Sequence, residues 1–441
     1  MNTPPWIARN LAASFLGSAW NKNDLRLAAT KTLGLATRAA QRALINRLFD
    51  AHNAPTPPSE DWLTSYFLMS EWFEIASLRA REHPRGVNAV LTPPRFAPSQ
   101  RFADFGAPKL TAPGELAKWL AVSIEYLDWF ADRKRMQAKT DIPLLQHYSY
   151  KFAPKKSGPP RLIESPKPQL KAMHRLILRE MLNCAPVHEC AQGFVRRRSC
   201  LTAAKIHAGE HVLITADLKD FFLNTRLSRV HGVFRNLGYA QPVARLLTAL
   251  CSTSTPQSLF ARLPVSQRHD WETRKRFEAP HLPQGAPTSP ALANLCAWRL
   301  DCRLFGLAKS FGANYTRYAD DMAFSGDKAF ADRVAGFVAA LETIAADEGF
   351  ALNRRKTRVM RGHTSQRVTG VVVNEHVNIA RKDYDRLKAI LHNCRRNGPE
   401  AENRAQIRTF RAHLDGRVNW VETVNPNRGT KLRRIFNEIS W

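Results

Sequence analysis

The stretch Tyr315-Thr-Arg-Tyr-Ala-Asp-Asp-Met-Ala-Phe324 decides the fold of this chain. Two short strand-forming runs flank Ala319, Asp320 and Asp321, and this pattern predicts a tight hairpin with two acids at its tip. Adjacent carboxylates repel each other, so a fold leaves such a pair in water unless a cation compensates the charge. A solvated turn and a cation site are therefore the two interpretations, and Mg²⁺, which prefers oxygen ligands, is the natural cation.

A second acidic position upstream favours the cation site. Val212-Leu-Ile-Thr-Ala-Asp-Leu-Lys-Asp-Phe-Phe222 is an apolar strand that ends in Asp217. A strand that brings one carboxylate beside a hairpin carrying two more can hold two divalent ions about 4 Å apart, the arrangement used for in-line phosphoryl displacement. We therefore predict a site for two Mg²⁺ ions formed by Asp217, Asp320 and Asp321, which would also be the catalytic residues.

A loop between these acids adds to the pattern. In His281-Leu-Pro-Gln-Gly-Ala-Pro-Thr-Ser-Pro-Ala-Leu-Ala-Asn294, glycine and prolines fix a loop, and Thr288, Ser289 and Pro290 begin a helix. An ordinary loop-to-helix cap would look the same. The position of the loop between the two acidic motifs favours a functional role, in which Gln284 faces the site.

Composition indicates the class of partner. Lys and Arg outnumber Asp and Glu by 66 to 38, and the resulting charge of +28 is spread along the chain. Such a balance predicts a polyanionic partner, and nucleic acid is the first candidate. The seven cysteines form no C-x-x-C pair, so we expect them to be reduced. No apolar run reaches the roughly 20 residues of a bilayer span, and we expect a cytoplasmic protein without a membrane partner.

Hydrophobic periodicity divides the chain into helical and mixed parts. Residues 1 to about 90 follow a helical pattern that is broken at residues 53–59 and fades at residues 83–86. Five prolines in residues 92–113 suggest a linker or an arm lying on another surface. A helix pair is predicted at residues 115–135, and the chain after Asn374 is helical and basic. Strands are predicted at Tyr148–Phe152, Arg161–Ile163, His211–Ala216, Tyr315–Tyr318, Met322–Ser325 and Val368–Val373.

Three stretches, in this order, resemble reverse transcriptases: Asp217-Leu-Lys-Asp-Phe-Phe222, Leu282-Pro-Gln-Gly-Ala-Pro-Thr-Ser-Pro290 and Tyr318-Ala-Asp-Asp321. The similarity continues into Lys155–Ile163 and Leu352–Arg358. It covers roughly residues 145–441, and the combination of motifs is highly specific.

Within that family the chain is most similar to the bacterial retron class. Val368-Thr-Gly370 matches a triplet that marks the class, and Ala203-Ala-Lys-Ile-His207 matches its Asn-Ala-x-x-His marker with Ala in place of Asn. The resemblance implies an α+β, right-hand polymerase fold with fingers, a palm with an antiparallel sheet and a helical thumb. The expected domains are a helical N-terminal extension with a Pro-rich linker at 1–110, a helical lead-in and fingers at 111–215, the palm at 216–374 and a basic thumb at 375–441.

The resemblance also implies roles for single residues. Phe222 matches the aromatic ring that excludes a ribose 2′-hydroxyl, which predicts dNTP substrates, and Gln284 matches a residue near the nucleotide's sugar and phosphate. Arg161 and Lys356 match basic residues that neutralise the triphosphate. Trp420 is expected in the core of the thumb. Residues expected to contact RNA are His207, Val368, Thr369, Gly370, Arg408, Arg411 and Lys431.

The function implied by the resemblance is that of an RNA-directed DNA polymerase, a nucleotidyltransferase with a two-metal mechanism. Retron enzymes pair with a cognate structured noncoding RNA, prime DNA synthesis from an internal guanosine 2′-hydroxyl and make branched multicopy single-stranded DNA (msDNA). They act in anti-phage defence, with an effector protein as a further partner. The alternatives are another bacterial reverse transcriptase, intron-like or diversity-generating, and an RNA-binding scaffold of a defence complex.

Overall fold

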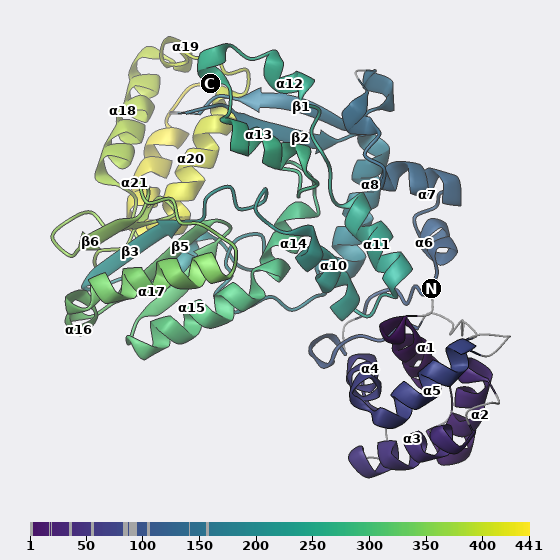
Figure 1. The fold of residues 1–441 in the computed structure, drawn as a ribbon. Helices are drawn as coiled ribbons and strands as arrows, with labels where there is room; N and C mark the ends of the chain where they lie inside the picture. The colour runs from purple at the N-terminus through teal and green to yellow at the C-terminus, as the bar shows by residue number, and fades with distance from the viewer. Residues whose placement is uncertain are drawn as a thin grey trace. The chain divides into compact units, whose positions relative to one another are not determined.

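The chain divides into two compact units, Met1–Arg95 and Phe96–Trp441, and each is described by itself. The computed structural model describes residues 3–16, 18, 20–34, 38–53, 57–82, 87, 95–103, 106–140, 142–155 and 158–441. In Figure 1 the described residues of the N-terminal unit form helices and their connections, and the larger unit has helices around a central sheet. The larger unit contains all of the predicted site residues.

The N-terminal unit packs its helices around an apolar core of its own, which includes Ile7, Leu44 and Phe67. Ser59 begins the fourth helix because its side chain accepts a hydrogen bond from the backbone N–H of Trp62. The predicted break at residues 53–59 falls between the third and fourth helices, although residues 54–56 and 83–86 lie outside the described residues. The helices are α1 (Pro4–Leu16), α2 (Lys22–Leu33), α3 (Arg38–Ala51), α4 (Glu60–Met69) and α5 (Glu71–Glu82).

Only part of the predicted Pro-rich linker, residues 95–103 and 106–113, is described. Within the larger unit its backbone is held as an arm on another segment, because Ala97 N–H donates to the Gly238 carbonyl and Ser99 N–H donates to the Asn236 carbonyl, both at 2.9 Å. This part of the segment is therefore packed against the loop that follows helix α10 (Leu227–Asn236).

The first half of the larger unit carries a two-stranded ribbon surrounded by helices (Figure 1). Strands β1 (Tyr148–Ala153) and β2 (Arg161–Pro166) pair antiparallel, with Tyr148 opposite Pro166. Both strands were predicted, and so was the helix pair, which the structure forms as α6 (Pro113–Trp119) and α7 (Ile124–Ala131). Further helices are α8 (Pro168–Ile177), α9 (Cys200–Ile206), α11 (Gln241–Leu250), α12 (Ser258–Ala261) and α13 (Trp271–Glu278).

The central sheet has four strands in the order β4-β5-β3-β6, and every neighbouring pair is antiparallel. Helices α15 (Trp298–Ser310) and α17 (Val334–Asp347) run along the sheet in Figure 1, and α15 contacts both β4 and α17. Apolar side chains such as Ile214 and Phe324 are fully buried in the resulting core. The strands are β3 (Val212–Asp217), β4 (Asn314–Tyr318), β5 (Asp321–Gly326) and β6 (Arg358–Arg361), with α14 (Ser289–Cys296) and α16 (Lys328–Asp332) nearby.

One strand was missed by the sequence analysis and one predicted strand needs correction. Strand β6 was not predicted, because Arg358-Val-Met-Arg361 alternates only weakly and is largely exposed. The single strand predicted at Val368–Val373 is wrong, since the structure forms β7 (Arg367–Val368) and β8 (Val371–Val372) with Val368 opposite Val371. Thr369 and Gly370, with φ values of 47° and 90°, form the two-residue turn between them.

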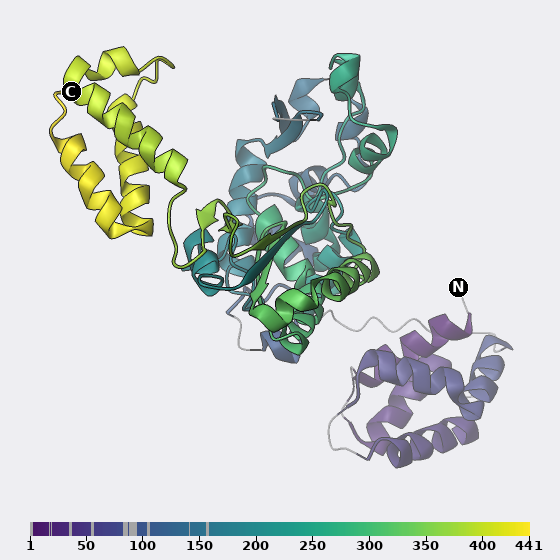
Figure 2. The same cartoon turned by 90° about the vertical axis from the view of Figure 1, so that its left-hand side faces the viewer.

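The C-terminal helices form a bundle with a separate apolar core (Figure 2). Its helices are α18 (Arg381–Asn397), α19 (Pro399–Glu402), α20 (Phe410–Val424) and α21 (Pro426–Asn437). Trp420 is 40% exposed, so its predicted place in the core of this bundle is wrong, and Leu414 and Val418 fill the core instead. None of the helices within the described residues is long and apolar enough to cross a membrane.

Candidate active site

The three predicted acids meet at one end of the central sheet. Asp217 is the last residue of β3 and stands directly opposite Asp321, the first residue of β5, in the antiparallel register. Asp320 lies in the turn of the β4–β5 hairpin, where its carbonyl accepts a hydrogen bond from Leu218 N–H at 2.9 Å. The predicted hairpin is thus confirmed, and strand pairing accounts for the meeting of acids more than a hundred positions apart in the chain.

Burial, together with mutual repulsion, raises the pKa of two of these acids. Burial raises the pKa of Asp320, and the nearby Asp217 charge adds to the shift. The pKa of Asp321 is raised to about 6 by burial and by the charges of Asp320 and Asp217. An added cation would relieve this repulsion, and hard carboxylate oxygens are the donors that a divalent ion prefers.

Lys356 supplies a positive charge at the site. Its Nζ lies 2.8 Å from Oδ2 of Asp217, although most of the lysine side chain is exposed. The preceding loop is held beside β3, because Asn353 N–H donates to the Asp217 carbonyl and Lys219 N–H donates to the Ala351 carbonyl. The structure therefore places Lys356 on a carboxylate of the site, whereas the resemblance had matched it to the triphosphate.

The carboxylates of this site are suitable ligands for a divalent ion. Their side chains, however, are not positioned close enough together to bind one. Within the described ranges, no three His, Cys, Asp or Glu side chains are grouped closely enough to hold a metal ion. The ammonium of Lys356 instead neutralises Asp217. Binding of an ion by all three acids would therefore require their side chains to turn toward one another and Asp217 to leave the lysine.

Of the residues predicted to bind the nucleotide, Arg161 and Lys356 lie within electrostatic range of these acids. Arg161, exposed at the start of β2, is close enough that its charge lowers the pKa of Asp320. The backbone of Gln284 runs beside β2, since its carbonyl accepts from Glu164 N–H at 3.0 Å. Phe222 is half-buried against Phe221, with ring centroids 5.7 Å apart. Strand β2, which carries Arg161, and the loop of Gln284 are therefore in direct backbone contact.

Sequence reasoning missed Lys155. Burial lowers the pKa of its ammonium, and Arg161 and Lys356 lower it further, while Asp220 and Asp217 act in the opposite direction. Lys155 therefore lies within electrostatic range of the acids and adds to the positive charge facing them. Its position within the Lys155–Ile163 motif was the available signal.

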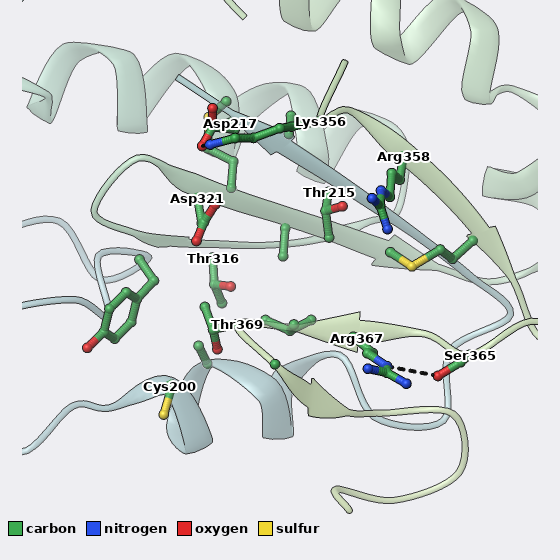
Figure 3. A pocket seen from close by; sticks show the side chains of 18 residues that line it. Cys200, Thr215, Asp217, Thr316, Asp321, Lys356, Arg358, Ser365, Arg367 and Thr369 are labelled. Carbon is green, nitrogen blue, oxygen red and sulfur yellow. Dashed lines mark hydrogen bonds and ion pairs between the residues drawn. The ribbon is translucent and has the colours of Figure 1, made fainter. Parts of the chain in front are cut away.

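A cavity of about 870 Å³ extends from the acids to the β7–β8 turn (Figure 3). Asp217, Asp321 and Lys356 lie together in the view, and Arg367, bonded to Ser365, lies apart from them toward the other side. Thr369 also lines the cavity, and its hydroxyl, although buried, has no hydrogen-bond partner. Further polar residues of the lining are Thr215, Thr316 and Arg358.

The structure separates the predicted RNA-contacting residues into two groups. His207 is fully buried, and its ring nitrogens lie 2.8 Å from Ser325 Oγ and 2.7 Å from Thr316 Oγ1, so it joins α9 to β4 and β5. Val368 is buried as well. In this conformation neither side chain is available for direct contact with RNA. The accessible group comprises Thr369 and Gly370 at the cavity and the exposed Arg408, Arg411 and Lys431 of the C-terminal bundle.

A buried arginine behind the hairpin was not predicted. Arg317 of β4 is completely buried and binds the carboxylate of Asp301 through Nε at 2.8 Å and Nη2 at 2.6 Å. Its Nη1 donates to Asn294 Oδ1 and to the carbonyl oxygen of Ala319, each at 2.9 Å. Ala319 has a φ of 57°, so this hydrogen bond supports the strained residue that precedes the paired acids.

Comparisons with known proteins agree with this geometry. Residues 153–373 match the family model described as "Reverse transcriptase (RNA-dependent DNA polymerase)", which defines the class of this site. The chain is 38% identical over 385 residues to the Retron Mx65 reverse transcriptase of Myxococcus xanthus, covering 86% of this chain and 82% of that protein. It is 35% identical to the Retron Mx162 reverse transcriptase of the same organism, covering 76% and 68%, and 33% identical to the Retron Ec86 reverse transcriptase of Escherichia coli, covering 55% and 68%.

The chain therefore belongs to the family of retron reverse transcriptases and is an RNA-directed DNA polymerase. Reverse transcriptases generally use divalent metal ions, in keeping with the acidic donor set described above.

Proposed function

We propose that this protein copies a cognate structured noncoding RNA, which serves as both template and primer, into msDNA. Synthesis would start from the 2′-hydroxyl of an internal guanosine of that RNA. The observation that carries the proposal is the cavity, which joins Asp217 and Asp321 to the turn formed by Thr369 and Gly370. The Val368-Thr369-Gly370 triplet of the retron class thus lines the same space as two of the predicted catalytic acids, where a priming ribonucleotide would lie.

In this proposal Asp217, Asp320 and Asp321 hold two Mg²⁺ ions, with Lys356 released from Asp217 toward the triphosphate. Bound divalent ions supply Lewis-acid activation of the attacking hydroxyl and stabilise charge on the phosphates. Arg161 and Lys356 neutralise the triphosphate, and Gln284 contacts the nucleotide near its sugar. Phe222 lies against the sugar and excludes a 2′-hydroxyl by its size.

The parts of the larger unit take the roles of the right-hand fold. The β1–β2 ribbon belongs to the fingers, the central sheet is the palm and the α18–α21 bundle is the thumb. Arg408, Arg411 and Lys431 would grip the phosphates of the RNA, a contact that depends on salt rather than on sequence. The N-terminal unit remains an extension available to a partner, and the expected biology is anti-phage defence with an effector protein.

The proposal is tested with the full chain purified together with the RNA transcribed from its neighbouring locus. With dNTPs and Mg²⁺, the wild type should make DNA joined to RNA, and the variant D320N/D321N should make none. D332N, which removes an exposed carboxylate from the end of α16, is the matched control and should retain synthesis.

Three other results carry different meanings. DNA made only on a supplied primer and template would leave the polymerase in place and remove the retron product, in favour of an intron-like or diversity-generating enzyme. Tight RNA binding without synthesis on either substrate would favour the RNA-binding scaffold. Loss of synthesis in D332N would show that the effect is not specific to the acids.

A further inference from the structure

A buried ion pair lies between the β1–β2 ribbon and the loop that precedes α14. Glu164 of β2 is 0% exposed, and its Oε2 lies 2.9 Å from Nε2 of His281, which is 2% exposed. The other carboxylate oxygen accepts a hydrogen bond from Thr255 Oγ1 at 2.6 Å. Neither member of the pair lines the cavity at the acids, and none of the roles proposed above uses them.

Hydrogen-bond geometry gives the protonation state of His281. Its Nδ1 lies 2.8 Å from the carbonyl oxygen of Ala279, so both ring nitrogens face oxygens that act as acceptors. Each nitrogen must then carry a proton, and the ring is an imidazolium that faces the Glu164 carboxylate. Burial lowers the pKa of His281, but the charge and hydrogen bond of Glu164 and the Ala279 carbonyl outweigh it, and the net pKa is raised.

The other ionisable groups around Glu164 stay neutral. Tyr148 and Tyr150 of β1 face this carboxylate, and burial, with a contribution from Glu164, raises the pKa of both phenols. The charged groups of the cluster are therefore the Glu164 carboxylate and, below the raised pKa of His281, its imidazolium. A change in the charge of His281 would leave the carboxylate unpaired in the interior, which is strongly unfavourable.

The pair joins two segments that carry predicted nucleotide-binding residues. Glu164 N–H donates to the carbonyl of Gln284 at 3.0 Å, and Arg161 lies three residues earlier on the same strand. A Cβ atom on Gly285, whose φ is 141°, would lie 2.8 Å from the carbonyl oxygen of Glu164. Strand β2 and the loop thus run in direct backbone contact, and the ion pair fixes them from the buried side.

We propose that the Glu164–His281 ion pair is a positioning device that holds Arg161 and Gln284 in the relative placement needed to bind the incoming dNTP. This inference rests on the nucleotide-binding roles proposed above. The pair itself touches no substrate. Its loss would let β2 and the loop separate and would weaken nucleotide binding, while the acids at the end of the sheet would still support the chemical step.

The test uses the full chain with poly(rA)·oligo(dT), dTTP and Mg²⁺, and it separates KM from kcat. E164Q and H281Q should each raise the KM for dTTP about tenfold and change kcat by less than about twofold. The matched control is E348Q, which removes another buried carboxylate, one bound by Arg229, Arg299 and Arg303. This control should leave KM within about twofold of the wild type.

The variants R161A and Q284A separate this inference from the proposed site. If they raise KM while folded E164Q and H281Q do not, the positioning role is overturned and the nucleotide-binding roles stand. If R161A and Q284A leave KM unchanged, the nucleotide-binding roles fail and this inference fails with them. An equal rise of KM in E348Q would assign the effect to general destabilisation and would also overturn the positioning role.

A pH profile of the wild type requires no variant to fold. The imidazolium is present below the raised pKa of His281, so the KM for dTTP should rise as the pH increases above about 6.5, the ordinary histidine value, and through that raised pKa. The double variant E164Q/H281Q should lose this dependence. A wild-type KM that stays constant until the protein unfolds at high pH would overturn the proposal.

Discussion

Arg317 and Asp301 form a fully buried, bidentate ion pair directly behind the β4–β5 hairpin. The same guanidinium donates to the carbonyl of Ala319, the residue before Asp320. Asp301 belongs to α15, so the pair transmits the position of that helix to the turn that carries the paired acids. We expect the placement of the acids to depend on this interior contact, although neither Arg317 nor Asp301 lines the cavity.

R317K should therefore abolish most DNA synthesis and destabilise the fold. Lysine cannot donate to Asp301 and Ala319 at once, and disruption of a buried ion pair costs about 3–5 kcal/mol. Urea denaturation measures the loss. R133K alters an exposed pair with Asp128 and should change the free energy of unfolding by less than about 1 kcal/mol. Equal unfolding midpoints for R317K and the wild type would contradict the structural role.

His207 should make the protein less stable in mild acid. Burial lowers its pKa to about 4, so the folded state keeps this ring neutral while the unfolded chain takes up a proton below about pH 6.5. Its contribution is complete above about pH 6.5 and falls as the pH drops toward 4, by about 2 kcal/mol near pH 5.

The variant H207Q isolates the contribution of His207 to the pH dependence of stability. Its free energy of unfolding should depend less steeply on pH than that of the wild type between about pH 7.5 and about pH 5. H363Q changes an exposed histidine and should follow the wild-type curve. Parallel curves for H207Q and the wild type would mean that His207 is protonated in the folded state.

Phe222 should control the choice between deoxyribonucleotides and ribonucleotides. F222V removes the ring expected against the sugar, and the ratio of kcat/KM for dTTP over that for UTP should fall at least about tenfold. F222Y keeps a ring of the same width and should preserve the ratio. Single-nucleotide incorporation on poly(rA)·oligo(dT) measures both. An unchanged ratio in F222V would place the discrimination elsewhere.

We expect Thr369 to lower the stability of the β7–β8 turn and to be needed for DNA synthesis. This β-branched residue has a φ of 47°, and its hydroxyl lies at the cavity without a hydrogen-bond partner. T369N should stabilise the β7–β8 turn by about 1 kcal/mol, because asparagine tolerates this conformation better. DNA yield on the cognate RNA should fall nonetheless, while the exposed control T364N should match the wild type. A stabilised T369N with full yield would leave the hydroxyl without a role.

The sequence was most informative where the residues that form a local structural pattern are also the residues of the candidate site. The Tyr-Ala-Asp-Asp turn is flanked by strand-forming residues, so both the hairpin and its acids could be predicted from ten residues. The Thr369-Gly370 turn could also have been found, because a glycine between paired valines is a hairpin signal. The extended pattern of Val368–Val373 concealed it.

Other features of the site depend on tertiary contacts, which a local sequence pattern cannot predict. Arg317 looks like any strand arginine, and only the packing of α14 and α15 against β4 makes it a buried partner of Asp301. Lys356 was matched to the triphosphate, yet the fold places it on Asp217, because the loop before it pairs with the end of β3. His207 was matched to RNA, yet the fold places it between two hydroxyls of the sheet.

The apolar core of α18–α21 has a consequence for how members of this family diversify. Leu391, Leu414 and Leu432 pack within the bundle and not into the core of the central sheet, whereas Val424 of α20 packs with Leu213 and Ala323 of the sheet. The bundle can therefore change its surface without repacking the sheet as long as Val424 is kept. Residues 381–441 behave in this sense as an exchangeable cassette. A chimera that takes this cassette from a relative would bring its own interior with it, and RNA preference could evolve while the acids stay fixed.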